Sequence, residues 1–246
     1  MASSSNLPEQ SQIFEPNHES ERQPLLGRPD FSERADILRY LFAKTGIIAE
    51  IGVLILCTTI WAHIFSIPFA FFSGHPLAMS IAIFILTQSV LVQQPITPED
   101  GDSKRRGQQI HAALNLFAFL ALVIGFTIVE VTVAQLQSDH FPSTHSICGG
   151  LTLLVLTAQY VVGFTMWMTP SLYGGEDRAK SLYKYHRYLG YLILVMLLTT
   201  VFTATLTGYN TAVLGIPSWV AVFAAVLIVV GVFPRIQKQK LGLQVE

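Results

Sequence analysis

Six long apolar stretches, separated by short segments rich in Pro, Gly and Ser, constrain this chain more than any other feature. They cover about residues 45–68, 76–95, 108–134, 145–169, 186–208 and 214–233. A helix needs about 20 apolar residues to cross a hydrocarbon core of about 30 Å, and each stretch reaches that length. Only 13% of the 246 residues are charged, against about 25% in soluble domains. The pattern predicts an all-α polytopic membrane protein with six transmembrane helices.

The Lys and Arg residues predict how these helices are oriented. All fifteen lie before the first stretch, in or directly beside the second-to-third and fourth-to-fifth connections, or in the carboxyl tail. Because cytoplasmic loops are enriched in Lys and Arg, both termini are expected to face the cytosol. The predicted domains are a disordered cytosolic tail over 1–40, a transmembrane domain over 41–236 and a cytosolic tail over 237–246. The polar first segment has no apolar run typical of a cleavable signal peptide.

Four of the seven histidines fall at two depths in the predicted bundle. His75 and His145 begin the second and fourth stretches, on the non-cytosolic side. His111 and His186 lie near the start of the third and fifth, on the cytosolic side. Ionisable residues inside spans usually mark functional sites, and two imidazoles at one depth can take both axial positions of a haem iron. The residues alone leave haem ligation, a proton relay and a metal transporter open.

The histidines also lie in distinctive local sequences. His75 is part of F-S-G-H-P-L-A-M-S over 72–80, and His145 begins H-S-I-C-G over 145–149. His186 is followed four residues later by Gly190, and the basic run 104–106 precedes His111. Together these segments resemble the cytochrome b561 family over about residues 45–235. The resemblance is closest to the small cytochrome b561 domain-containing members.

The resemblance implies a four-helix di-haem core formed by the second to fifth helices. It implies two haem b groups, with His75 and His145 ligating the outer iron and His111 and His186 the inner iron. No catalytic residue beyond these ligands is predicted. The implied activity is that of a transmembrane ascorbate-dependent oxidoreductase, which passes electrons from cytosolic ascorbate to monodehydroascorbate or ferric iron on the other side. A homodimer is a further expectation from the family, and the net charge of −1 gives no sign of a nucleic-acid partner.

Basic residues beside the inner histidines are candidates for binding the anionic donor. They are Lys104, Arg105, Arg106, Arg178, Lys180 and Arg187. The chain departs from better-known members four residues after His111, where they carry a second histidine and this sequence has Asn115. Thr144 and Ser146 are local candidates for hydrogen bonds that orient the His145 ring. The alternatives are a histidine-relay secondary transporter or proton channel, or a haem subunit of a larger redox complex.

One motif in the amino-terminal tail predicts where the protein is delivered. Residues 21–26, E-R-Q-P-L-L, resemble an acidic dileucine sorting signal. Such a signal in a cytosolic tail indicates an endosomal, lysosomal or vacuolar membrane.

Overall fold

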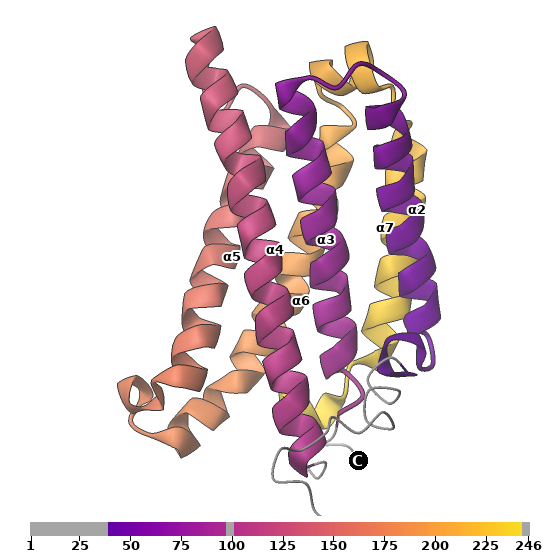
Figure 1. Ribbon diagram of the computed structural model, residues 1–246. Helices are drawn as coiled ribbons and strands as arrows, with labels where there is room; N and C mark the ends of the chain where they lie inside the picture. Colours follow the sequence, from indigo (N-terminus) through magenta and orange to yellow (C-terminus); the bar gives the residue numbers. More distant parts are fainter. Residues whose placement is uncertain (1–38, 97–100, 243–246) are drawn as a thin grey trace, which may run out of the picture.

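The structure is a bundle of long helices that alternate in direction (Figure 1). The computed structural model describes residues 39–96 and 101–242, and this part of the chain contains no strand. Six of its helices are long and apolar enough to cross a membrane, so the predicted fold class is confirmed. They are α2 (Gly46–Phe65), α3 (Gly74–Gln93), α4 (Gly101–Leu136), α5 (Thr144–Met168), α6 (Glu176–Ala204) and α7 (Ser218–Val232). The predicted tail over 1–40 lies outside the described residues except for 39 and 40, which are helical.

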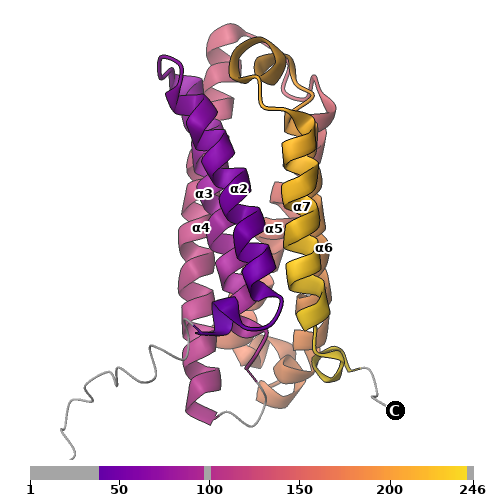
Figure 2. The same cartoon turned by 90° about the vertical axis from the view of Figure 1, so that its right-hand side faces the viewer.

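The six helices form three antiparallel pairs. α3 packs mainly on α4, α5 on α6, and α2 on α7, and the last pair also contacts α3 and α6 (Figures 1 and 2). Small residues bring α2 and α7 close together: a Cβ added at Gly231 would collide with the backbone of Ala49. Close backbone approach at glycine is typical of helix packing in membranes. Because α3 packs mainly on α4, and α5 on α6, the α3–α4 and α5–α6 hairpins form two separate units. Helices α2 and α7 flank them on one side.

α4 and α5 expose large apolar side chains over most of their length. The most exposed include Leu116, Phe117 and Ile124 on α4 and Leu154, Val161 and Phe164 on α5. Such a surface is unfavourable in water and suits hydrocarbon, because a span surrounded by lipid tails needs no polar face. This exposure fits helices at the periphery of a membrane protein.

Two helices begin earlier than hydropathy predicts. α4 begins at Gly101 and α6 at Glu176, because polar segments before each apolar stretch continue the same helix. In α6 the first turn carries Glu176 and Asp177, whose charges favour a helix amino terminus. The inner histidines were expected near helix starts, and the structure corrects this: His111 and His186 each lie ten residues inside a helix.

Short helical turns connect and end the spans. η2 (Phe71–Ser73) precedes α3, η3 (Pro170–Tyr173) precedes α6, and the π-turn η4 (Asn210–Leu214) precedes α7. Gly174 and Gly175 both have positive φ, at 84° and 105°, which glycine adopts without strain. After α7 the chain turns through η5 (Phe233–Arg235) and η6 (Lys238–Leu241), which lies against the bundle.

Candidate functional site

The four histidines lie on the two hairpins, two toward each end of the bundle. We call the end at which α3 and α5 begin the His75 end, and the end at which α4 and α6 begin the His111 end (Figure 1). His75 and His145 occupy the first turns of α3 and α5. Every Lys and Arg of the described residues precedes α2, lies in the first half of α4 or α6, or follows α7, and so lies toward the His111 end.

The rings of His75 and His145 face each other across the two hairpins. Their centroids are 6.1 Å apart and their planes are inclined by 74°. Phe72 stacks on His75 with a centroid separation of 5.6 Å. Both histidines line a cavity of about 600 Å³ whose walls are mainly apolar side chains of α3 to α6. This volume lies within the range of small-molecule and cofactor sites.

Main-chain carbonyls of the neighbouring helices orient these two rings. The Nδ1 of His75 lies 3.0 Å from the carbonyl oxygen of Gly125, and the Nδ1 of His145 lies 3.0 Å from that of Thr200. A carbonyl only accepts hydrogen bonds, so Nδ1 carries the proton in both rings and Nε2 presents its lone pair. Ser146, expected to orient His145, instead forms a capping box with Ser143 at the start of α5.

His111 is held even more firmly at the opposite end. Its Nδ1 lies 2.7 Å from Ser89 Oγ and 3.1 Å from the Ser89 carbonyl oxygen. Asn115 holds Ser89 and His111 in place, because its Nδ2 donates to Ser89 Oγ at 2.6 Å and to the His111 carbonyl at 2.7 Å. Asn115, four residues after His111, thus helps to fix the His111 ring.

His186 is fixed by packing rather than by hydrogen bonds to its ring. Its Nδ1 is buried and has no hydrogen-bond partner among the described residues. Gln159 Nε2 donates to its main-chain carbonyl at 2.6 Å. The ring lies against Gly163, where a Cβ would come within 2.7 Å of its Cε1. The rings of His111 and His186 are near enough to interact electrostatically.

His75, His145 and the cavity that they line fit haem better than a bare metal ion. Metal–imidazole bonds are about 2.0–2.1 Å in zinc sites, so a metal between two rings needs about 4 Å between their coordinating nitrogens. The 6.1 Å between the centroids of His75 and His145 accommodates this. The described residues contain no group of three or more His, Cys, Asp or Glu suited to a bare ion. A porphyrin supplies four nitrogens of its own, so two histidines and an apolar cavity suffice.

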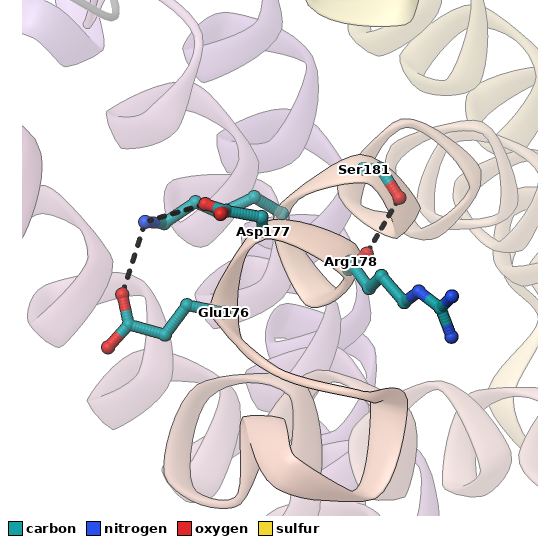
Figure 3. A network of polar contacts seen from close by, with 5 residues as sticks. Glu176, Asp177, Arg178 and Ser181 are labelled. Atoms are coloured by element: carbon teal, nitrogen blue, oxygen red, sulfur yellow. Dashed lines mark hydrogen bonds and ion pairs between the residues drawn. The ribbon is translucent and has the colours of Figure 1, made fainter.

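The predicted donor-binding residues lie at the His111 end and differ in exposure. Lys104 and Arg105 are exposed at the start of α4, with Arg106 half-buried. Lys180 lies between two carboxylates, 3.2 Å from Glu176 and 3.9 Å from Asp177, while the Arg178 side chain points away from them (Figure 3). Much of the Lys180 charge is therefore already compensated on the helix surface.

Arg187 and the carboxyl-terminal segment form a second basic region beside His186. Arg187 is half-buried, and its Nη1 donates to the Lys240 carbonyl at 2.7 Å. Lys240 Nζ in turn donates to the carbonyls of Gln93 and Gln94 at the end of α3, at 3.1 and 3.0 Å. Residues of the predicted tail from 237 onward thus bridge the ends of α3 and α6.

The His75 end has the opposite charge. Glu130 on α4 lies 3.2 Å from the ring of His140 in the α4–α5 connection, and both line the cavity together with Asp139. The connections at this end, residues 66–73, 137–143 and 205–217, contain no Lys or Arg.

Comparisons with known proteins match this chain to one family. The family model of eukaryotic cytochrome b561 matches residues 74–215. The chain is 29% identical over 131 residues to the bovine (Bos taurus) transmembrane ascorbate-dependent reductase CYB561, covering 52% of this chain and 50% of that protein. It is 31% identical over 99 residues to the zebrafish (Danio rerio) lysosomal membrane ascorbate-dependent ferrireductase CYB561A3, covering 40% of each. The chain thus spans about half the length, or less, of these curated relatives.

Proposed function

The chain belongs to the eukaryotic cytochrome b561 family, and on this premise we propose that it carries electrons across a membrane on two haem b groups. His75 and His145 hold one haem in this proposal, and His111 and His186 hold the other. Bound haem supplies one-electron exchange between ferric and ferrous iron. A haem held by two histidines would have no open position for oxygen, so it would serve electron transfer.

The observation that carries the proposal is the repeated spacing of the histidine contacts. His75 and Ser89, which contacts His111, are fourteen residues apart on α3. His186 and Thr200, which contacts His145, are also fourteen apart on α6. At 1.5 Å per residue, each spacing is about 21 Å, most of a hydrocarbon core of about 30 Å. Redox groups at these two levels carry charge through the bilayer rather than along one surface.

The protein contributes ligand orientation and exclusion of water. Hydrogen bonds from Nδ1 to carbonyls fix the tautomer and raise the basicity of the ligating nitrogen in His75, His145 and His111. The apolar lining of the cavity keeps water from the iron and lowers the local dielectric constant.

The donor in this proposal is ascorbate at the His111 end, which faces the cytosol by the distribution of basic residues. Ascorbate is an anion at neutral pH, and Arg187 is the half-buried cation next to a proposed ligand. The exposed residues Lys104, Arg105 and Arg178 contribute a longer-range positive field that raises the local concentration of an anion. Two relatives named as ascorbate-dependent reductases support this donor.

The acceptor in this proposal is a ferric species at the His75 end. Glu130 and Asp139 are among the residues that line the cavity, and no basic residue occurs in the neighbouring connections. Negative charge here would attract cationic iron and repel the monodehydroascorbate anion. A relative named as a ferrireductase supports this choice.

The membrane in this proposal is that of an endosome, lysosome or vacuole. The dileucine-like segment 21–26 lies outside the described residues, and one relative is named as a lysosomal membrane protein. Replacing Leu25 and Leu26 by Ala is expected to move the tagged protein to the cell surface. Unchanged delivery to the organelle would refute this role of the motif.

The experiment that tests the proposed function is a haem count combined with reduction. The protein is purified in detergent, its haem per polypeptide is measured, and spectra are recorded after ascorbate and then dithionite. We expect two haems with low-spin b-type spectra, reduced largely by ascorbate. Haem that only dithionite reduces would reject ascorbate as donor, and folded protein expressed with ample haem but lacking it would reject the function.

A further inference from the structure

One carboxyl group buried among the membrane helices has no role in the site described above. Glu50 lies in the second turn of α2, near the His111 end, and is only 6% exposed. Its Oε2 accepts a hydrogen bond from Gln88 Nε2 at 2.8 Å. Its Oε1 is buried and has no hydrogen-bond partner among the described residues. A buried carboxylate oxygen without a partner is costly, so this position needs an explanation.

Arg235 is the charged neighbour that makes the ionised form possible. It is 7% exposed at the end of α7, and its charge acts on Glu50. Its N–H groups, however, donate to main-chain carbonyls: Nη1 to Leu41 at 3.4 Å, and Nη2 to Tyr40 and to Leu91 at 3.3 Å. Arg235 therefore compensates the charge of Glu50 without occupying its second oxygen, which remains available to a proton.

Glu50 and the proposed ligand His111 contact consecutive residues of α3. On α3, Gln88 contacts Glu50, and the next residue, Ser89, contacts the His111 ring. The carbonyl of Leu91, within the same turn, accepts from Arg235. Residues within one turn of α3 therefore contact Glu50, Arg235 and His111. Charges buried at such a separation are screened far less than charges in water, so a negative charge added at one is felt at the other.

We propose that Glu50 takes up a proton when the haem at the His111 end is reduced. The proposal rests on the function proposed above. When one electron from the donor reduces a haem held by His111 and His186, the Glu50 carboxylate would accept one proton from water at this end and become the acid. When the electron moves to the second haem, the proton returns to water. Total charge in this part of the bundle thus stays constant through each transfer.

Few other titratable or charged groups face Glu50. From the end of α7 it faces Arg235, and from α6 Tyr191 interacts with Arg235; the neighbour on α3 is the neutral Gln88. Lys44, in the turn before α2, is exposed. Arginine does not titrate in proteins, and tyrosine titrates well above neutral pH. Glu50 is therefore the group of this cluster able to exchange a proton near neutral pH.

The test is a redox titration of the purified, haem-loaded protein at a series of pH values from acid to neutral. The wild-type potential of the haem at the His111 end is expected to fall as pH rises, because reduction is coupled to proton uptake. Glu50→Gln keeps the size of the side chain and an acceptor for Gln88, and we expect it to abolish this pH dependence. Glu130→Gln removes a carboxyl at the other end and is expected to leave the dependence intact.

Infrared difference spectra of the oxidised and reduced protein provide a second, direct measurement. The wild type is expected to show a carboxylic acid C=O band that appears on reduction, and the band should be absent in Glu50→Gln. A haem-loaded wild type without such a band, or with a potential independent of pH, overturns the inference while leaving the proposed function intact. So does a Glu50→Gln variant that keeps both signals. If Glu50→Gln fails to fold, Glu50→Asp is expected to restore both signals, and their loss in folded Asp protein counts against the inference.

Discussion

The α3–α4 and α5–α6 hairpins carry the same arrangement of contacts but secure their histidines by different physical means. The corresponding positions are His75, Ser89, His111 and Gly125 in the first hairpin, and His145, Gln159, His186 and Thr200 in the second. Within each helix the two positions are fourteen residues apart, and the third position of each hairpin is the proposed ligand at the His111 end. The atoms that make these contacts differ between the two hairpins.

Ser89 bonds to the ring of His111, whereas Gln159 bonds only to the main chain of His186. Histidine ligands in metal sites generally donate their second N–H to a nearby acceptor. His186 lacks that partner among the described residues and instead packs on Gly163. Of the two proposed ligands at the His111 end, His111 is thus oriented by hydrogen bonds and His186 by the space that a glycine leaves open.

The largest effect that tests the comparison is loss of a single haem. His75→Ala and His111→Ala each remove one proposed haem ligand, and each is expected to lose a different haem, so that the proposed two haems per polypeptide fall to about one. The two remaining spectra should differ and together should account for the wild-type spectrum. Loss of the same spectral component in both variants would contradict the pairing across the two hairpins.

Much of this arrangement is predictable from sequence, and the part that is not has a clear physical cause. Hydropathy and the distribution of basic residues predict six spans and place the four histidines at two levels. The partners of His75 and His145 are main-chain carbonyls of Gly125 and Thr200, and a carbonyl leaves no residue-type signal in a sequence. The local candidates Thr144 and Ser146 were wrong for the same reason, because the true partner lies on the neighbouring helix.

Helix lengths were the other difference between expectation and structure. The polar start of α6 has no hydropathy signal of a span, although its acidic first turn and the preceding Gly175 mark a helix start. That signal was present in the sequence and would have placed His186 inside a helix. The partner of Arg187, by contrast, is the carbonyl of Lys240 more than fifty residues later, which only the folded chain reveals.

The second-largest expected effect is weaker haem binding when the space that Gly163 leaves beside the His186 ring is filled. In Gly163→Ala the new methyl group would lie 2.7 Å from the His186 ring, whereas in Gly149→Ala it would lie an ordinary 3.5 Å from Thr200 Cγ2. We expect Gly163→Ala to displace the ring and weaken haem binding at the His111 end by about 10–100-fold. Gly149→Ala should bind both haems normally.

Haem retention during dilution and washing, followed by absorbance of each component, measures this difference. The ring has no hydrogen bond to restore its position, and serine adds a hydroxyl to the same methyl position, so Gly163→Ser should be no better tolerated than Gly163→Ala. Equal retention in Gly163→Ala and Gly149→Ala would mean that the close contact is not what orients His186.

A third and smaller effect separates the hydrogen-bonded ligand from the packed one. Ser89→Ala removes the 2.7 Å contact to Nδ1 of His111 but leaves the main-chain carbonyl at 3.1 Å. A weaker hydrogen bond makes the ligating nitrogen less basic, so the ferric state is less stabilised and the potential of this haem should rise. Gln159→Ala leaves the ring contacts of His186 unchanged and should shift the potential less.

Potentiometric titration of both variants measures the two shifts, with the haem assigned by its absence in His111→Ala. Asn115→Ala should give a shift between those of the two variants, because it removes the hydrogen bond to Ser89 Oγ but no hydrogen bond to the His111 ring. A larger shift in Gln159→Ala than in Ser89→Ala would show that the main chain of His186, and not the ring of His111, sets the potential.

The smallest effect concerns the charges around this end of the bundle. Lys180 is exposed and already paired with Glu176 and Asp177, and pairs of this kind contribute roughly 0–1 kcal/mol. Lys180→Gln should therefore leave the KM for ascorbate nearly unchanged. Arg187 is half-buried and held by the Lys240 carbonyl, so its charge is less screened by water. Arg187→Gln should raise this KM several-fold and reduce its dependence on salt.

Steady-state reduction by ascorbate at low and high ionic strength distinguishes the two residues, with haem content measured in the same samples. Dithionite reduction should be equally complete in both variants, because neither residue is a proposed ligand. A KM that rises more in Lys180→Gln than in Arg187→Gln would place the donor over the exposed start of α6. It would also show that the half-buried cation next to His186 serves packing with the carboxyl-terminal segment rather than donor binding.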